Sequence, residues 1–139
     1  MTSPQNLVKN VMCPDALLGR KALVGGASKG LGQAIAQALA SSGAVVHGLS
    51  RDEATLSAAM QDLPGSGHRA TAVDFDHSEA LGNVVGDACY DILIHNTGGP
   101  AAGPLADAIL MTWMRHFAVM FGRPMCLSLI HISEPTRRM

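Results

Sequence analysis

The stretch ALVGGASKGLGQAIAQALA, residues 22–40, passes from an apolar run through a glycine-rich loop into an alanine-rich segment. Residues Lys21–Gly25 are short, apolar and followed by glycine, which is typical of a buried β-strand. In the alanine-rich part a large aliphatic side chain recurs every fourth residue, at Leu31, Ile35 and Leu39. This spacing predicts a helix that packs closely on a sheet, and Gly43 is expected to end that helix.

The rest of the chain repeats this alternation of strand and helix. A second buried strand is predicted at Ala44–Leu49, and two further strands at Arg69–Val73 and Asp91–His95. Helical spacing of apolar residues predicts helices around Leu56–Leu63 and Leu81–Ala88, and one from Leu105 that carries Ile109, Trp113, Phe117 and Met120 on one side. Strands that alternate with helices in this way form parallel β-α-β units. We therefore expect an α/β fold of the Rossmann type, a doubly wound parallel sheet with helices on both faces, truncated after about four strands in the order 3-2-1-4.

The order of the strands in such a sheet places the ligand site. The order reverses between the first and the fourth strand, and ligands bind in the crevice outside the carboxyl ends of the strands at that point. Two loops open there, the glycine loop after the first strand and the segment NTGGPAAGP, residues 96–104. The least regular segments of the sequence thus fall where the fold predicts a site.

The glycine loop has the pattern G-x-x-x-G-x-G, formed by Gly26, Gly30 and Gly32. One glycine permits the sharp turn off the strand, one lets backbone amides approach a pyrophosphate, and one lets the helix pack closely. The N–H groups and the dipole at the start of the next helix favour phosphate. The alternative is a glycine-rich turn that binds no ligand, which the flanking strand and helix disfavour.

GGASKGLG, the strand–helix alternation and HNTGG together resemble the short-chain dehydrogenase/reductases, over residues 18–126. The resemblance implies an NAD(P)(H)-dependent oxidoreductase that interconverts a carbonyl and an alcohol on a small molecule. It implies a cofactor site made of Gly26, Ser28, Lys29, Gly30, Leu31, Gly32, Ser50, Arg51, Asp74, Phe75, Asn96, Thr97 and Gly98. Asp74 matches the acidic residue that usually meets the adenine, and Asn96 matches the residue that supports the central strand.

Two details refine the resemblance. The position before Gly26, commonly threonine in the family, is Gly25 here. The NTGGP form of the loop after the fourth strand resembles a subset described as 3-oxoacyl-carrier-protein reductase-like. The resemblance also implies a homo-oligomer, a dimer or tetramer, for the full-length form.

The choice of cofactor depends on the residues near the end of the second strand. An acidic residue there would accept hydrogen bonds from the ribose of NAD and would repel a 2′-phosphate. Ser50 and Arg51 occupy that tip, and Lys29 adds a second cation in the glycine loop. Two cations and a hydroxyl suit a phosphate, so we expect NADP(H) rather than NAD(H). Asp52 keeps the alternative open, because it could be the ribose ligand if the strand ends one residue later.

The chain offers no proton donor of the family type. Reduction of a carbonyl needs a donor at the forming alkoxide, which the family takes from a serine and a Tyr-x-x-x-Lys pair. The only tyrosine is Tyr90, Ile94 stands four residues on, and Met120 occupies a position where the family often has asparagine. We therefore assign no catalytic residue and expect this chain by itself to be inactive. A non-catalytic dinucleotide-binding module remains the alternative, and the basic loop disfavours a methyltransferase-like site.

Composition excludes other classes of function. The net charge of −1 gives no electrostatic basis for binding nucleic acid or an anionic membrane, and no apolar run is long enough to span a bilayer. Three scattered cysteines predict free thiols in a reducing cytoplasm, and six histidines at no ligand spacing predict no metal site. The methionines of the helix after Leu105 are expected in the core or at a subunit interface.

Three segments of the chain are expected to differ in nature. Residues 1–17 are expected to form a loose leader, residues 18–126 a partial dinucleotide-binding domain, and residues 127–139 a non-native tail. The tail LSLIHISEPTR resembles one translated frame of a transposase sequencing adapter over eleven consecutive residues. For that reason His131 and Glu134 are assigned no functional role.

Overall fold

A computed structural model describes residues 13–85, 88–98, 103–107, 109–122, 124–125 and 128. The chain forms two compact units, which are described separately. The first comprises residues 1–73 and 90–96, and the second comprises residues 74–89 and 97–139. Most of the predicted leader and of the predicted tail lies outside the described residues.

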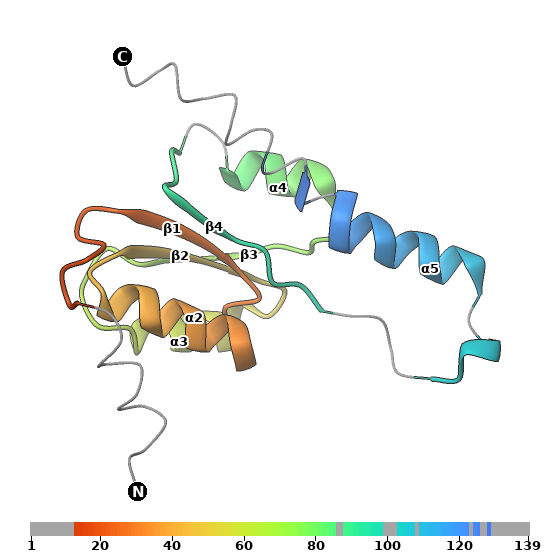
Figure 1. Ribbon diagram of the computed structural model, residues 1–139, viewed down its shortest axis with the longest axis horizontal. Helices are drawn as coiled ribbons and strands as arrows, with labels where there is room; N and C mark the ends of the chain where they lie inside the picture. The colour runs from red at the N-terminus through yellow and green to blue at the C-terminus, as the bar shows by residue number, and fades with distance from the viewer. Residues whose placement is uncertain are drawn as a thin grey trace, which may run out of the picture. The chain divides into compact units, whose positions relative to one another are not determined.

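The first unit is built on a four-stranded parallel sheet (Figure 1). Its strands are β1 (Lys21–Gly25), β2 (Val45–Ser50), β3 (Arg69–Ala72) and β4 (Ile92–Ile94). They lie in the order β3-β2-β1-β4, and every neighbouring pair is parallel. The predicted fold class and strand order are confirmed.

Two helices of the first unit cover one face of this sheet (Figure 1). These are α2 (Gly30–Ser41) and α3 (Glu53–Gln61). The core between helices and sheet is formed by small and medium apolar side chains, including Ala22, Val24, Ala36, Val46, Leu56 and Leu63. Burial of this kind of surface is the main favourable term in folding.

The buried stripe of α2 differs from the predicted one. Its buried residues are the small ones, Gly32, Ala36 and Ala40, and Leu39 packs against the core only in part. Leu31 is 69% exposed, although it belongs to the aliphatic series whose spacing predicted the packed helix. Small residues let the helix lie close to the sheet, and this places the adjacent larger side chains at the margin of the contact.

The ends of the elements follow local backbone chemistry. Gly43 has φ +92°, a left-handed conformation that glycine adopts without strain, and it ends the turn after α2 as predicted. A turn at Cys13–Gly19 is fastened to it, because the Leu17 N–H donates to the Ser42 carbonyl at 2.8 Å. Helix α3 ends before Pro64, as the sequence predicts.

On the first unit a buried polar network joins β2, β3 and the segment before β4. Nδ1 of His47 is hydrogen-bonded to Oη of Tyr90, and its Nε2 lies 2.7 Å from Oγ1 of Thr71. His47 is 5% exposed. Its burial lowers the pKa of the imidazole, and the charge of Arg69 lowers it further. The folded chain therefore favours neutral His47.

This burial predicts loss of stability in mild acid. The unfolded chain binds a proton at His47 near the ordinary pKa of about 6.5, whereas the folded chain binds it only at lower pH. The His47 contribution to the free energy of unfolding is thus complete above about pH 6.5 and falls as the pH drops below it. Chemical denaturation between pH 8 and pH 5 measures the slope. His47→Gln, which does not titrate, is expected to flatten it, and an unchanged slope would contradict the assignment.

The second unit is helical in its described part. It contains α4 (Ser78–Val85), a 3₁₀ turn η1 (Leu105–Asp107), α5 (Leu110–Phe117) and a π-helical turn η2 (Ala118–Gly122). The predicted continuous helix from Leu105 is therefore interrupted, because Ile109 has extended backbone angles and α5 starts after it. Ala88 lies outside α4, contrary to the prediction.

The apolar side of α5 is not buried among the described residues. None of the eight α5 residues, all of which the structure describes, is buried. The large apolar side chains on and beside this helix are exposed: Ile109, Leu110, Met111, Trp113, Met114, Phe117, Met120 and Phe121. This exposure leaves the predicted core environment unfilled by the described residues, and the subunit interface remains a prediction.

Candidate functional site

The glycine loop leaves β1 at the carboxyl edge of the sheet and is fixed against the end of β2. Ala27 is fully buried, and its N–H donates to the Leu49 carbonyl at 3.2 Å. The last residue of β2 is Ser50, one position beyond the predicted end of the strand. The loop therefore lies across the carboxyl ends of β1 and β2, where a Rossmann-type sheet binds its ligand.

The three glycines of the loop differ in backbone conformation and in the space around them. Gly26 has φ +61°, and a Cβ there would stand 2.7 Å from Nδ2 of Asn96. A Cβ on Gly32 would stand 2.1 Å from the carbonyl oxygen of Gly26, so the first turn of α2 packs directly on the loop. Gly30 has φ +60°, but a Cβ there would meet nothing within 4 Å. Gly26 and Gly32 permit close backbone packing, and Gly30 faces open space.

Asn96 links this loop to β4. Its Nδ2 donates to the Gly25 carbonyl at 3.3 Å, at the end of the central strand β1. This is the support of the central strand that the family resemblance implies. Because Asn96 also lies against the Cβ positions of Gly26 and Gly32, one side chain contacts both ends of the loop.

A fourth glycine, which the sequence analysis did not single out, completes the packing. A Cβ on Gly48 in β2 would lie 2.8 Å from Sδ of Met60 and 3.1 Å from Cβ of Ala27. This glycine therefore lets α3 and the loop both approach β2. An isolated glycine inside a strand pattern is the sequence signal for such a close approach.

The start of α2 is open to an anion. Lys29 is the N-cap residue and has extended backbone angles, and its side chain makes no capping hydrogen bond to the described helix. The first turn of α2 contains no acidic residue. The free N–H groups and the positive end of the helix dipole are thus available for phosphate, with Gly30 and Leu31 exposed beside them.

Two serines, each followed in the sequence by a basic residue, meet where the loop crosses β2. Oγ of Ser50 donates to Oγ of Ser28 at 2.9 Å, and both side chains are buried. The residues that follow them, Lys29 and Arg51, are exposed. Of these four predicted site residues, the structure joins Ser28 and Ser50 directly, and Lys29 and Arg51 follow them in the sequence.

Asp52, the alternative ribose ligand, caps α3. Its Oδ1 accepts from the N–H groups of Ala54 and Thr55, and its Oδ2 accepts from the Thr55 hydroxyl at 2.6 Å. These hydrogen bonds lower the pKa of the carboxyl, the Thr55 hydroxyl contributing most. The end of β2 at Ser50, one residue later than predicted, meets the condition for Asp52 as the ribose ligand. Its capping hydrogen bonds count against that role, because both carboxylate oxygens serve the start of α3.

The remaining predicted residues belong to the second unit. Asp74 and Phe75 are half-buried in a turn after β3, where Oδ1 of Asp74 accepts from the Asp76 N–H at 2.9 Å. Asp76 pairs with Arg115 of α5. Thr97 is half-buried and Gly98 exposed, and both follow Asn96 directly.

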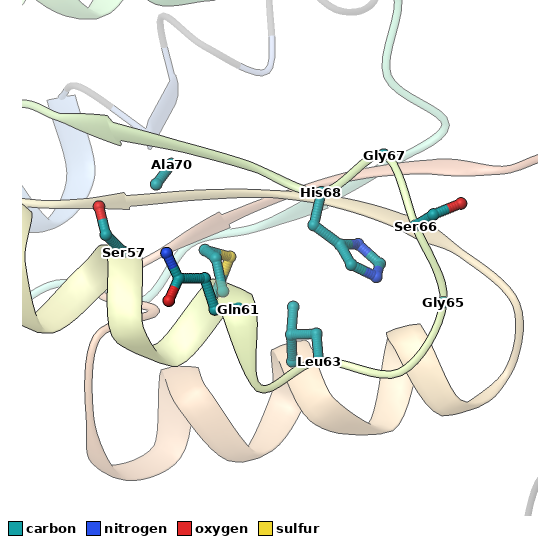
Figure 2. A pocket seen from close by; sticks show the side chains of 9 residues that line it. Ser57, Gln61, Leu63, Gly65, Ser66, Gly67, His68 and Ala70 are labelled. Carbon is teal, nitrogen blue, oxygen red and sulfur yellow. The ribbon is translucent and has the colours of Figure 1, made fainter.

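A cavity of about 340 Å³ lies elsewhere on the first unit, beside the second half of α3 and the start of β3 (Figure 2). The imidazole of His68 points into it. Nδ1 of that ring accepts from the Val46 N–H at 3.0 Å, and its Nε2 lies 2.8 Å from the Pro64 carbonyl. Both ring nitrogens are therefore hydrogen-bonded to the backbone. We assign this cavity no catalytic or binding role.

In the described part of the chain no three His, Cys, Asp or Glu side chains are grouped as metal ligands would be. Nor does any helix of that part have the length and apolar character needed to cross a membrane.

Comparison with known proteins identifies the family of the chain. The short chain dehydrogenase family matches residues 20–132. D-erythrulose reductase of Gallus gallus is 33% identical over 129 residues, which cover 91% of this chain and 50% of that protein. The chain thus spans half the length of this relative.

Two solved structures are similar in sequence as well as in fold. A metagenomic short-chain oxidoreductase in complex with NADP is 34% identical, with a TM-score of 0.67 over 78% of this chain and 53% of that one. L-Sorbose reductase from Gluconobacter frateurii, complexed with NADPH and L-sorbose, is 25% identical, with a TM-score of 0.72 over 81% of this chain and 46% of that one. A family match over most of the chain, on the Rossmann-type sheet and glycine loop described above, shows that the chain belongs to the short chain dehydrogenase family.

Proposed function

We propose that this chain is the dinucleotide-binding part of an NADP(H)-dependent oxidoreductase that interconverts a carbonyl and an alcohol on a small molecule. The observation that carries the proposal is the glycine loop, which is packed at Gly26 and Gly32 and open at Gly30, at the uncapped start of α2. The bound dinucleotide supplies or accepts the hydride. The residues of this chain bind its phosphates and orient it.

The preference for NADP(H) rests on the end of β2. Lys29 and Arg51 provide two exposed cations there, and the neighbouring carboxylate of Asp52 is engaged in capping α3. Guanidinium and ammonium groups suit a 2′-phosphate by charge, and the arginine adds a bidentate fork. Two similar proteins were solved with NADP or NADPH bound.

For the substrate we propose only a chemical class, and for the quaternary structure only a homo-oligomer. The proposed substrate is a small-molecule carbonyl compound or alcohol, and the NTGGP loop resembles that of a 3-oxoacyl-carrier-protein reductase-like subset. Full-length protein is proposed to act in the cytoplasm as a homo-oligomer, in which a second copy covers the exposed apolar side of α5. Non-catalytic dinucleotide binding is the second candidate, because the sequence contains no Tyr-x-x-x-Lys.

The proposed function is tested by separating binding from turnover. The purified chain is expected to bind NADPH, measured by calorimetry, but to oxidise none of it with a 3-oxoacyl thioester or a ketose, because no proton donor of the family type is present. Failure to bind either dinucleotide would contradict the proposed site. Substrate-dependent oxidation of NADPH by the chain would contradict the expected inactivity.

A further inference from the structure

The hydrogen bond between Ser28 and Ser50 joins the two segments that carry the basic residues of the site. Ser28 immediately precedes Lys29 in the glycine loop, and Ser50 immediately precedes Arg51 at the end of β2. Oγ of Ser50 donates to Oγ of Ser28 at 2.9 Å. A side-chain hydrogen bond therefore connects the two segments that carry the basic residues.

The two hydroxyls differ from the two cations in exposure. Ser28 is 8% exposed and Ser50 is 9% exposed, whereas Lys29 and Arg51 are exposed residues. The adjacent backbone hydrogen bond, from the Ala27 N–H to the Leu49 carbonyl, fastens the same two segments at 3.2 Å. The serine pair thus adds a second, buried connection beneath the exposed charges.

We propose that the Ser28–Ser50 hydrogen bond is a positioning element that sets Lys29 and Arg51 at the separation a 2′-phosphate requires. This inference rests on the proposed NADP(H) function and assigns the two serines a role of their own. Two long basic side chains lose conformational freedom when they bind one phosphate, and a fixed separation of their backbones reduces that cost. In this role Ser50 acts through Ser28 and does not itself need to touch the cofactor.

The competing explanation is that each hydroxyl contacts the phosphate on its own. The two explanations differ in how the effects of substitution combine. Loss of either partner breaks a shared hydrogen bond completely, so a second substitution changes nothing more. Independent contacts to a ligand would give effects that add.

The experiment measures the affinity of the chain for adenosine 2′,5′-bisphosphate and for adenosine 5′-monophosphate by calorimetry. The proteins are the wild type, Ser28→Ala, Ser50→Ala and the double variant. Each single variant is expected to bind the bisphosphate about fivefold more weakly and the monophosphate with less than twofold change. The double variant is expected to match the single variants.

Ser42→Ala is the matched control, because Ser42 is a buried serine whose hydroxyl donates to the Ala38 carbonyl at the far end of α2. It is expected to leave both affinities unchanged. Amide hydrogen exchange gives a readout without ligand, and the Ala27 N–H is expected to exchange faster in Ser50→Ala than in Ser42→Ala.

The outcomes separate this inference from the function on which it rests. If wild type does not prefer the bisphosphate, the NADP(H) proposal fails and the inference fails with it. If wild type prefers the bisphosphate but the two serine substitutions add, or weaken both ligands equally, the positioning role alone is wrong.

Discussion

Replacement of Arg51 by alanine is expected to weaken binding of NADPH by roughly tenfold or more and to leave binding of NADH nearly unchanged. Arg51 is exposed just beyond β2, close in sequence to the serine that contacts the glycine loop. A charge-assisted hydrogen bond to phosphate contributes about 1.5–3 kcal/mol, and only NADPH carries the 2′-phosphate. Fluorescence titration of the chain with each cofactor measures both dissociation constants.

Arg20→Ala is the control for this prediction. Arg20 is also exposed, but it lies just before β1, at the other end of the strands, where its Nη1 is 3.2 Å from Oδ1 of Asp91. Its loss is expected to change neither affinity, since exposed ion pairs contribute little. If Arg51→Ala weakened the binding of NADPH and of NADH equally, Arg51 would not contact the 2′-phosphate.

Gly32→Ala is expected to destabilise the fold and to abolish dinucleotide binding. The added Cβ would stand 2.1 Å from the carbonyl oxygen of Gly26 and 2.7 Å from Nδ2 of Asn96. A backbone atom cannot move aside alone, so the loop, α2 or β4 must shift. Overpacking in a core costs about 1–3 kcal/mol, and we expect the upper end of that range or more. Urea denaturation measures the loss of stability, and titration with NADPH measures the loss of binding.

The matched control for this substitution is Gly82→Ala in α4. A Cβ at Gly82 meets nothing within 4 Å, and alanine is the better helix former by about 1 kcal/mol. The control is therefore expected to be neutral or slightly stabilising. Wild-type stability and wild-type affinity in Gly32→Ala would mean that α2 does not pack on the loop as described.

The sheet was predictable because its signals are local and repeated. Short apolar runs between helical patterns marked all four strands, and β1 has the predicted bounds. The other strands differ from prediction by one residue at one or both ends. Those differences arise because hydrogen-bond pairing, rather than hydrophobicity, decides where a strand ends.

The features that the sequence did not predict depend on contacts between distant segments. Leu31 is exposed because the packed face of α2 is formed by the smaller residues Gly32, Ala36 and Ala40. The N-cap at Asp52 could have been predicted from the sequence, because an aspartate before a helical pattern is a common N-cap. The interruption at Ile109 has no comparable signal in the periodicity of that segment.

The contact between Asn96 and Gly25 has a consequence for the order in which the chain folds. These residues are 71 positions apart, and the same asparagine lies against Gly26 and Gly32. Closing so long a loop is entropically costly, so such contacts form late compared with helices and turns. During synthesis Asn96 emerges after the glycine loop and the first three strands. The loop therefore lacks the contacts of this side chain until β4 has emerged from the ribosome and has paired with β1.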